Sequence, residues 1–281
     1  MSGEACCGVF KEAWKKLKGM KRYFWSSVML FTMTGLGGFC ILGLIIMAGQ
    51  VIYMPGLLQL VFADPAALLT PMLVIPTAMW GFLLLYHLAQ ALFEMFVLMP
   101  MRMGIRLIPL RHVAGKSIHP LFAFKYFSWK YIWRFILLDV LVILAVGIPI
   151  ALGGVLFCLP TMFGLGLAAS IALKIVGVLF YLLALYLYVS YVFVSLLIID
   201  RDIHPCLAMK LSRQAVAKKW FCIFGTLVML GVIITISMIP FFIGLFWSIP
   251  YAQNVLAILY RNMLGIEGKD PVSVCEAKHN Q

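Results

Sequence analysis

Four side chains of this sequence have the chemistry to handle protons or a polar solute inside an otherwise apolar chain. His87, Gln90 and Glu94 follow one another at i, i+3 and i+7, a spacing that places them on one face of a helix. Asp139 is a further acidic candidate in a separate apolar run. Because an ionisable group facing lipid costs about 2.5–3.5 kcal/mol on insertion scales, we expect this face to point into a helix bundle.

These residues have two interpretations. A functional polar track would use His87, Gln90, Glu94 and Asp139 to pass protons or a solute. A structural cluster would bond the same groups internally, with Glu94 near the cytosolic end of its helix and Asp139 paired with a neighbouring cation such as Arg134. The sequence favours the structural interpretation and leaves the track as the alternative.

No catalytic motif accompanies these side chains. The sequence lacks HExxH, GxSxG, a Walker phosphate-binding loop and the paired aspartates of phosphatidyl transferases. Its seven cysteines have no spacing typical of metal ligands. We therefore expect a protein that is not an enzyme, with no catalytic residues, no metal and no cofactor.

The composition places these residues in a membrane protein. Hydrophobic residues make up 64% of the chain and charged residues 11%, against about 45–50% and about 25% in soluble domains. The apolar runs are continuous and do not alternate with polar residues, which disfavours a β-barrel. The expected fold class is an all-α integral membrane protein.

Six apolar runs are long enough to cross a bilayer, which takes about 20 helical residues. They span 25–53, 72–99, 135–158, 171–199, 220–239 and 241–260. Every lysine and arginine except Lys174 falls on one side of this arrangement, and the intervening loops 54–71 and 160–169 have none. The positive-inside rule therefore predicts a multi-pass protein of the bacterial inner (cytoplasmic) membrane with both termini cytosolic.

Cations and aromatic residues gather where the spans meet the cytosol. Residues 9–24 are predicted to form an amphipathic helix lying in the membrane plane, with Phe10, Trp14, Leu17 and Phe24 on its apolar face. A second such helix is expected after Asp202 as its N-cap, with Pro205 in the first turn. The alternative is a solvated basic flank. The residues expected to contact lipid are Trp14, Lys15, Lys18, Trp25, Trp129, Lys130, Trp133, Lys210, Arg213 and Trp220.

The chain has the organisation of a threefold repeat. Units starting near residues 9, 119 and 204 each contain an in-plane segment, a tryptophan and two spans joined at a Pro/Gly bend. Three such hairpins predict a six-helix bundle surrounded by cytosol-facing in-plane helices. The expected parts are a cytosolic amphipathic segment (1–24), a membrane domain (25–265) and a polar, disordered cytosolic tail (266–281).

The C-terminal half carries a recognisable pattern. Asp200-Arg201, Pro205, Ser212, Trp220 and Tyr260-Arg261 lie in IIDRDIHPCLAMKLSRQAVAKKW and IPYAQNVLAILYRNMLG. Across residues 180–265 the chain resembles bacterial inner-membrane proteins related to the YciC-like families and to the membrane domain that accompanies some glycerophosphodiester phosphodiesterases. This resemblance implies the membrane architecture and no particular activity.

The expected function is that of a scaffold, assembly partner or bilayer-organising component, with a solute or ion transporter or channel as the alternative. The expected partners are anionic lipid headgroups of the cytosolic leaflet, together with protein partners or further copies of the chain. Nucleic acid is not expected, because the cations interleaved with aromatics at 121–134 directly precede a span, as an interfacial belt does.

Overall fold

A computed structural model describes residues 3–53, 77–164, 166–239 and 243–267. Every regular element in these ranges is a helix, which confirms the all-α prediction for them. The α-helices are α1 (Gly3–Tyr53), α3 (Thr77–Phe93), α4 (Met99–Val113), α5 (Trp129–Val142), α6 (Ile148–Phe163), α7 (Leu167–Ser190), α8 (Val194–Arg201), α9 (Pro205–Ala217), α10 (Trp220–Met238) and α11 (Leu245–Leu264). Two π-helical turns, η2 (Glu94–Leu98) and η4 (Ile143–Gly147), and a 3₁₀ turn, η3 (Pro120–Phe124), connect some of them.

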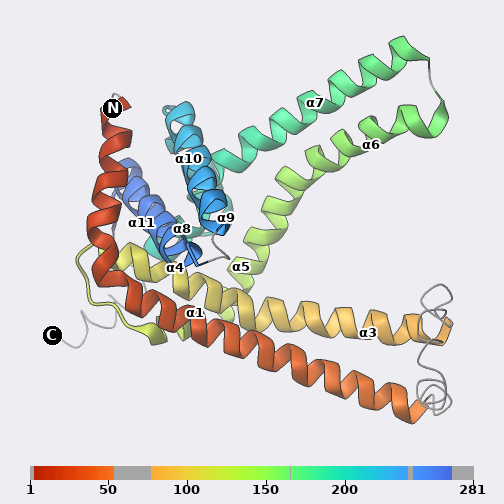
Figure 1. Cartoon of the computed structure of the whole chain (residues 1–281), viewed down its shortest axis with the longest axis horizontal. Helices are drawn as coiled ribbons and strands as arrows, with labels where there is room; N and C mark the ends of the chain where they lie inside the picture. The colour runs from red at the N-terminus through yellow and green to blue at the C-terminus, as the bar shows by residue number, and fades with distance from the viewer. Residues whose placement is uncertain (1–2, 54–76, 165, 240–242, 268–281) are drawn as a thin grey trace.

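Two long arms project from a central group of helices, α4, α8 and α11, which we call the hub. Figure 1 shows α1 beside α3 as one arm and α6 beside α7 as the other. In this view α4 and α8 lie between the inner ends of the arms, and α10 and α11 lie above them. The helix pairs follow the order of the three expected hairpins. The arms splay apart and do not close into the expected compact bundle, because each arm is anchored to a different part of the hub.

Four helical segments are long and apolar enough to cross a membrane, which identifies the chain as a membrane protein. They are Gly8–Ile45, Trp129–Phe163, Leu167–Arg201 and Trp220–Met238, and they match the first, third, fourth and fifth predicted spans. The second predicted span, 72–99, starts outside the described residues. The sixth, 241–260, falls largely on α11, which is mostly buried. The predicted number of six is therefore not confirmed.

The predicted in-plane helix at 9–24 is not a separate element. It continues without a break into the first span as α1. Its buried row comprises Val9, Ala13, Leu17, Met20 and Phe24, which pack on α11 and α4. Trp14, expected on the apolar face, is 61% exposed. Two overlapping rows of apolar residues fit the 3.6-residue period of this helix. The buried row contains Val9 and Ala13, which are smaller than Phe10 and Trp14 of the predicted row and therefore allow a closer contact between helices.

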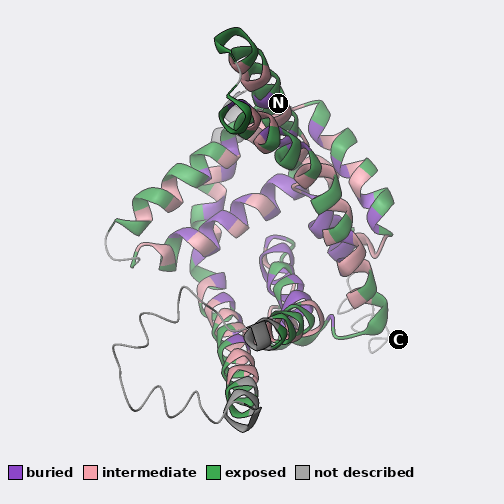
Figure 2. Ribbon diagram, turned by 90° about the vertical axis from the view of Figure 1, so that its right-hand side faces the viewer, coloured by how far each residue is buried: buried purple, intermediate pink, exposed green. Residues whose placement is uncertain are grey.

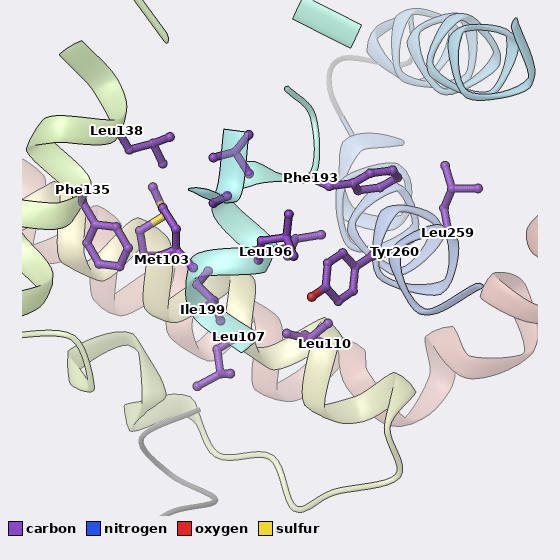
Figure 3. Close-up of a cluster of buried hydrophobic side chains, with 14 of the residues drawn as sticks. Met103, Leu107, Leu110, Phe135, Leu138, Phe193, Leu196, Ile199, Leu259 and Tyr260 are labelled. Atoms are coloured by element: carbon purple, nitrogen blue, oxygen red, sulfur yellow. The ribbon is translucent and has the colours of Figure 1, made fainter. Parts of the chain in front are cut away.

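The predicted inner loop 100–134 is also largely structured. Its first part is α4, which follows α3 and η2 directly and is buried along most of its length. Figure 2 shows buried residues gathered toward the centre of the molecule and exposed residues on the helices that project from it. Met103, Leu107 and Leu110 of α4 meet side chains of α5, α8 and α11 in one cluster (Figure 3). Because the sequence of α4 mixes cations with apolar residues, it predicted a loop at the membrane surface. The structure shows instead that packing against other helices buries most of this segment.

The start of α9 differs from the prediction at one residue. Pro205 is the first helical residue, as predicted, but His204 occupies the N-cap position. Asp202 instead caps the end of α8 with a left-handed φ of 53°. Its carboxylate accepts hydrogen bonds from Lys130 at 2.6 Å and from Arg134 at 2.5 Å. Two cations of α5 therefore take the carboxylate that was expected to cap α9.

The close approach of α4 and η3 depends on Gly104. A Cβ at this position would meet the backbone of Phe122 and Ala123, at 2.6 Å from the Ala123 Cα. We expect Gly104→Ala to lower the free energy of unfolding by about 1–3 kcal/mol, because backbone atoms must move. Thermal unfolding in detergent measures this. Gly225→Ala in α10, where a Cβ meets nothing within 4 Å, is the matched control, and equal melting temperatures for both variants would contradict the assignment.

Candidate functional site

Three interruptions of helical geometry occur around one pocket. The turn η2 separates α3 from α4, η4 separates α5 from α6, and the chain breaks between α7 and α8 at Tyr191–Phe193. Met99, Val142 and Tyr191, which adjoin these interruptions, all line the pocket. Turns of the π type inside α-helices occur frequently at functional sites, so their convergence marks this pocket as the candidate.

The pocket lies between the hub and the apolar helices and has a volume of about 440 Å³. This volume falls within the range of about 300–1,000 Å³ that is typical of small-molecule sites. Leu138, Leu196 and Leu227 are among its apolar lining residues. Its polar lining residues are Arg102, Arg106, Asp139, Tyr188, Tyr191, Ser195 and Gln253.

The charges of the pocket are divided between two helices. Arg102 and Arg106 are one turn apart on α4, and Asp139 projects from α5. Glu94, in η2, accepts a hydrogen bond of 3.2 Å from Arg102, and the two side chains are 52% and 45% exposed. Asp139 interacts electrostatically with both arginines and with Glu94. Two cations and two carboxylates therefore share this region.

The structure brings together only part of the predicted polar track. Glu94 and Asp139 lie near each other through their shared interaction with the α4 arginines. His87 is exposed two turns further along α3 and makes a ring contact with Tyr86. Neither His87 nor the half-buried Gln90 is among the residues that line the pocket. Arg134 binds Asp202 and not Asp139.

Arg102 and Arg106 were missed as site residues because their stretch resembled a basic loop. The available signal was their spacing of four residues, which places two cations on one helical face. Gln253 was evident as a polar residue within an apolar run. Tyr188 and Ser195 carried no comparable signal, because they come together only where α7 breaks.

A buried polar network holds the walls of the pocket in place. Asp200 of α8 is fully buried and accepts hydrogen bonds from the Tyr260 hydroxyl at 2.9 Å and from the Glu267 backbone N–H at 3.0 Å. Arg201 donates to the Leu264 carbonyl at 2.6 Å and pairs with Glu267 at 3.0 Å. These bonds tie α8, which supplies Ser195, to α11, which supplies Gln253.

Several predicted lipid-contact residues lie where helices of different hairpins meet. Trp25 stacks on Phe246 at a centroid distance of 4.7 Å and donates a hydrogen bond to its carbonyl. Trp129 stacks on Phe96, and Trp220 on Tyr186. Lys130 binds Asp202. The remaining predicted residues are exposed, namely Trp14, Lys15, Lys18, Trp133, Lys210 and Arg213.

The fold and the pocket together define an all-helical membrane protein with a charged pocket beside its apolar helices. No family model, curated protein or solved structure matches the chain. The resemblance to YciC-like proteins therefore stays a prediction. Within the described ranges, no three His, Cys, Asp or Glu side chains are grouped so that they could hold a metal ion.

The network around Asp200 makes a measurable contribution to stability. We expect Tyr260→Phe to lower the free energy of unfolding by about 1–3 kcal/mol, because the buried carboxylate loses a hydrogen-bond donor. Thermal unfolding in detergent tests this, with Tyr181→Phe on the exposed part of α7 as the matched control. An unchanged melting temperature for Tyr260→Phe would show that the hydroxyl is dispensable.

Proposed function

We propose that this chain is a non-catalytic multi-pass protein of a bacterial inner membrane that organises lipid around a cytosol-facing hub. The exposed cationic row of α1 carries the proposal. Lys11, Lys15, Lys18 and Arg22 are all exposed, on the side of α1 away from the row that packs on α11 and α4. Each Lys or Arg near an anionic leaflet contributes about 1 kcal/mol of attraction.

Aromatic side chains beside these cations support the same role. Lys21 lies 4.2 Å from the ring centroid of Trp247, and Trp25 stacks on Phe246. Tryptophan and tyrosine prefer the boundary between headgroups and acyl chains. Because α1 continues from this region into an apolar span, the cationic row and the span are parts of one continuous helix. We therefore expect headgroups held by the row to lie beside the hub.

The proposal includes six spans with both termini in the cytosol. Beyond the four apolar helices, it assigns the stretches 72–99 and 241–260 to the membrane as well. We expect a reporter that is active only in the periplasm to be inactive when fused after Ser117 and active when fused after Ala63, because the cations gather on the side of Ser117. Fusions in the same vector, checked for equal expression, measure this, and the reverse pattern would invert the topology.

The cationic row predicts a lipid preference that depends on salt. We expect the triple variant Lys11→Gln, Lys15→Gln, Lys18→Gln to bind phosphatidylglycerol on the order of a hundredfold more weakly than the wild type at low salt, because each of the three lost cations contributes about 1 kcal/mol and about 1.4 kcal/mol corresponds to a tenfold change in affinity. Native mass spectrometry of the full chain at low and high salt measures the retained lipid. Lys174→Gln, which removes a cation predicted on the opposite side, is the control. Retention by the triple variant that equals that of the wild type at both salt concentrations would contradict the proposal.

The helix interruptions favour transport as a second candidate function. Broken helices around a charged pocket are typical of transporter binding sites, and η2 begins at Glu94. In this case Glu94→Gln would reduce proton or ion flux in proteoliposomes at least tenfold, because a neutral amide cannot take up a proton in place of the carboxylate. Equal flux in both proteins, or no flux in either, would remove transport as a candidate.

A further inference from the structure

The pocket holds two charges of opposite sign that do not pair with each other. Within the part of the chain that the structure describes, neither the Arg106 guanidinium nor the Asp139 carboxylate takes part in a hydrogen bond or a salt bridge. Both line the same pocket. A direct salt bridge between these two side chains would have neutralised both charges without a ligand. Their separation leaves room for a ligand that carries both an anionic and a cationic group.

Depth in the membrane makes this arrangement costly without a ligand. Asp139 lies four residues after Phe135, the first residue of the predicted third span, which corresponds to about 6 Å of helix. Ionised side chains inside a span are generally paired or face a polar cavity. An Arg106 and an Asp139 that line one pocket without pairing are therefore placed to bind the two charges of a ligand.

We propose that this pocket binds the phosphoethanolamine headgroup of a zwitterionic lipid. The phosphate diester accepts hydrogen bonds from Arg106 and from the half-exposed Arg102, since guanidinium forks match phosphate oxygens. The primary ammonium donates to Asp139, with Glu94 nearby as a second carboxylate. The hydroxyls of Tyr188 and Ser195 and the amide of Gln253 supply further polar contacts.

The apolar residues that line the pocket indicate where the acyl chains of the lipid would lie. Leu138, Leu227 and Leu256 line the same pocket as the charged groups, and η4, which follows α5, begins at the exposed apolar residue Ile143. A lipid bound in this way places its headgroup against α4 and its chains along the apolar helices. This assignment rests on the proposed lipid-organising function and adds a selective site to it.

The charge pattern predicts selectivity among headgroups. Phosphatidylglycerol has the phosphate and neutral hydroxyls but no ammonium, so it leaves the charge of Asp139 without a cation, and a hydrogen bond from a neutral donor is weaker than one from a charged donor. Phosphatidylcholine has a quaternary ammonium, which carries no N–H to donate to Asp139. Phosphatidylethanolamine alone among these three satisfies both ends of the pocket.

The test offers the full-length wild type an equimolar mixture of the three lipids with identical acyl chains and counts the bound lipids by native mass spectrometry. We expect phosphatidylethanolamine to be retained roughly tenfold over the other two, the effect of losing one hydrogen-bonded charge. Asp139→Asn should abolish the preference over phosphatidylglycerol, and Arg106→Gln should reduce retention of phosphatidylethanolamine. Arg213→Gln, an exposed cation of α9 outside the pocket, should change neither.

Two further experiments distinguish loss of binding from loss of folding, and a lipid ligand from a soluble headgroup. Arg106→Lys, which preserves the charge and removes the fork, should retain an intermediate amount of phosphatidylethanolamine even if Arg106→Gln does not fold. Soluble glycerophosphoethanolamine should bind at least roughly tenfold more weakly than the lipid, since it lacks the acyl contacts; equal binding would overturn the lipid as the source of the headgroup.

Equal retention of the three lipids by the wild type, or an undiminished preference in Asp139→Asn, would overturn the pocket assignment. The lysine row of α1 is tested separately through salt-dependent retention of phosphatidylglycerol. If the wild type shows no headgroup selectivity but the lysine row still gives salt-dependent retention of phosphatidylglycerol, the pocket assignment is wrong and the proposed function stands.

Discussion

The buried carboxylate of Asp200 is the constraint on which the hub depends. A charge removed from water is tolerated only where other groups supply hydrogen bonds, and each of those groups is held in place in return. The Tyr260 hydroxyl and the Glu267 backbone N–H come from α11 and from the segment that follows it. The end of α8 is thereby joined to α11 by polar bonds as well as by apolar packing.

A second polar contact extends this attachment to the first helix. Arg261, next to Tyr260, binds Glu12 of α1 through two hydrogen bonds of 2.9 and 2.8 Å. Lys16 of α1 donates to the Val113 carbonyl at the end of α4. The hub is thus a set of helices from distant parts of the chain, held together by charged groups over an apolar cluster. The arms α3, α6 and α7, by contrast, expose apolar side chains along most of their length, as lipid-facing helices do.

The pocket stands out against this hub because its charges are not all paired. Asp202 and Asp200 are each bound by two or more donors, whereas Asp139 and Arg106 face a cavity from different helices. The π turn η4 begins soon after Asp139, and η2 precedes the α4 arginines. Such turns change the angular position of the residues that follow them, and residues next to both turns, Met99 and Val142, line the pocket.

Much of this organisation was predictable from composition and order. Long apolar runs at the first, third, fourth and fifth predicted spans indicate helices, since no other single-segment structure satisfies its backbone in lipid. The start of α9 at Pro205 was predictable because proline is favoured in the first turn of a helix, although the predicted N-cap, Asp202, ends α8 instead. Neither the burial of α4 nor the continuity of α1 was predictable, because cations in a short stretch look the same whether the intervening residues face solvent or a partner helix.

The sequence by itself determined that this is a helical membrane protein, because the length of its apolar runs is a property of the chain in order. It also supplied Glu94 and Asp139 as acidic groups within apolar runs. Only the tertiary structure decided their neighbours. Arg102, Arg106 and Asp139 come from segments more than thirty residues apart, and their positions depend on how α4, α5 and the broken α7–α8 segment pack, which no local pattern encodes.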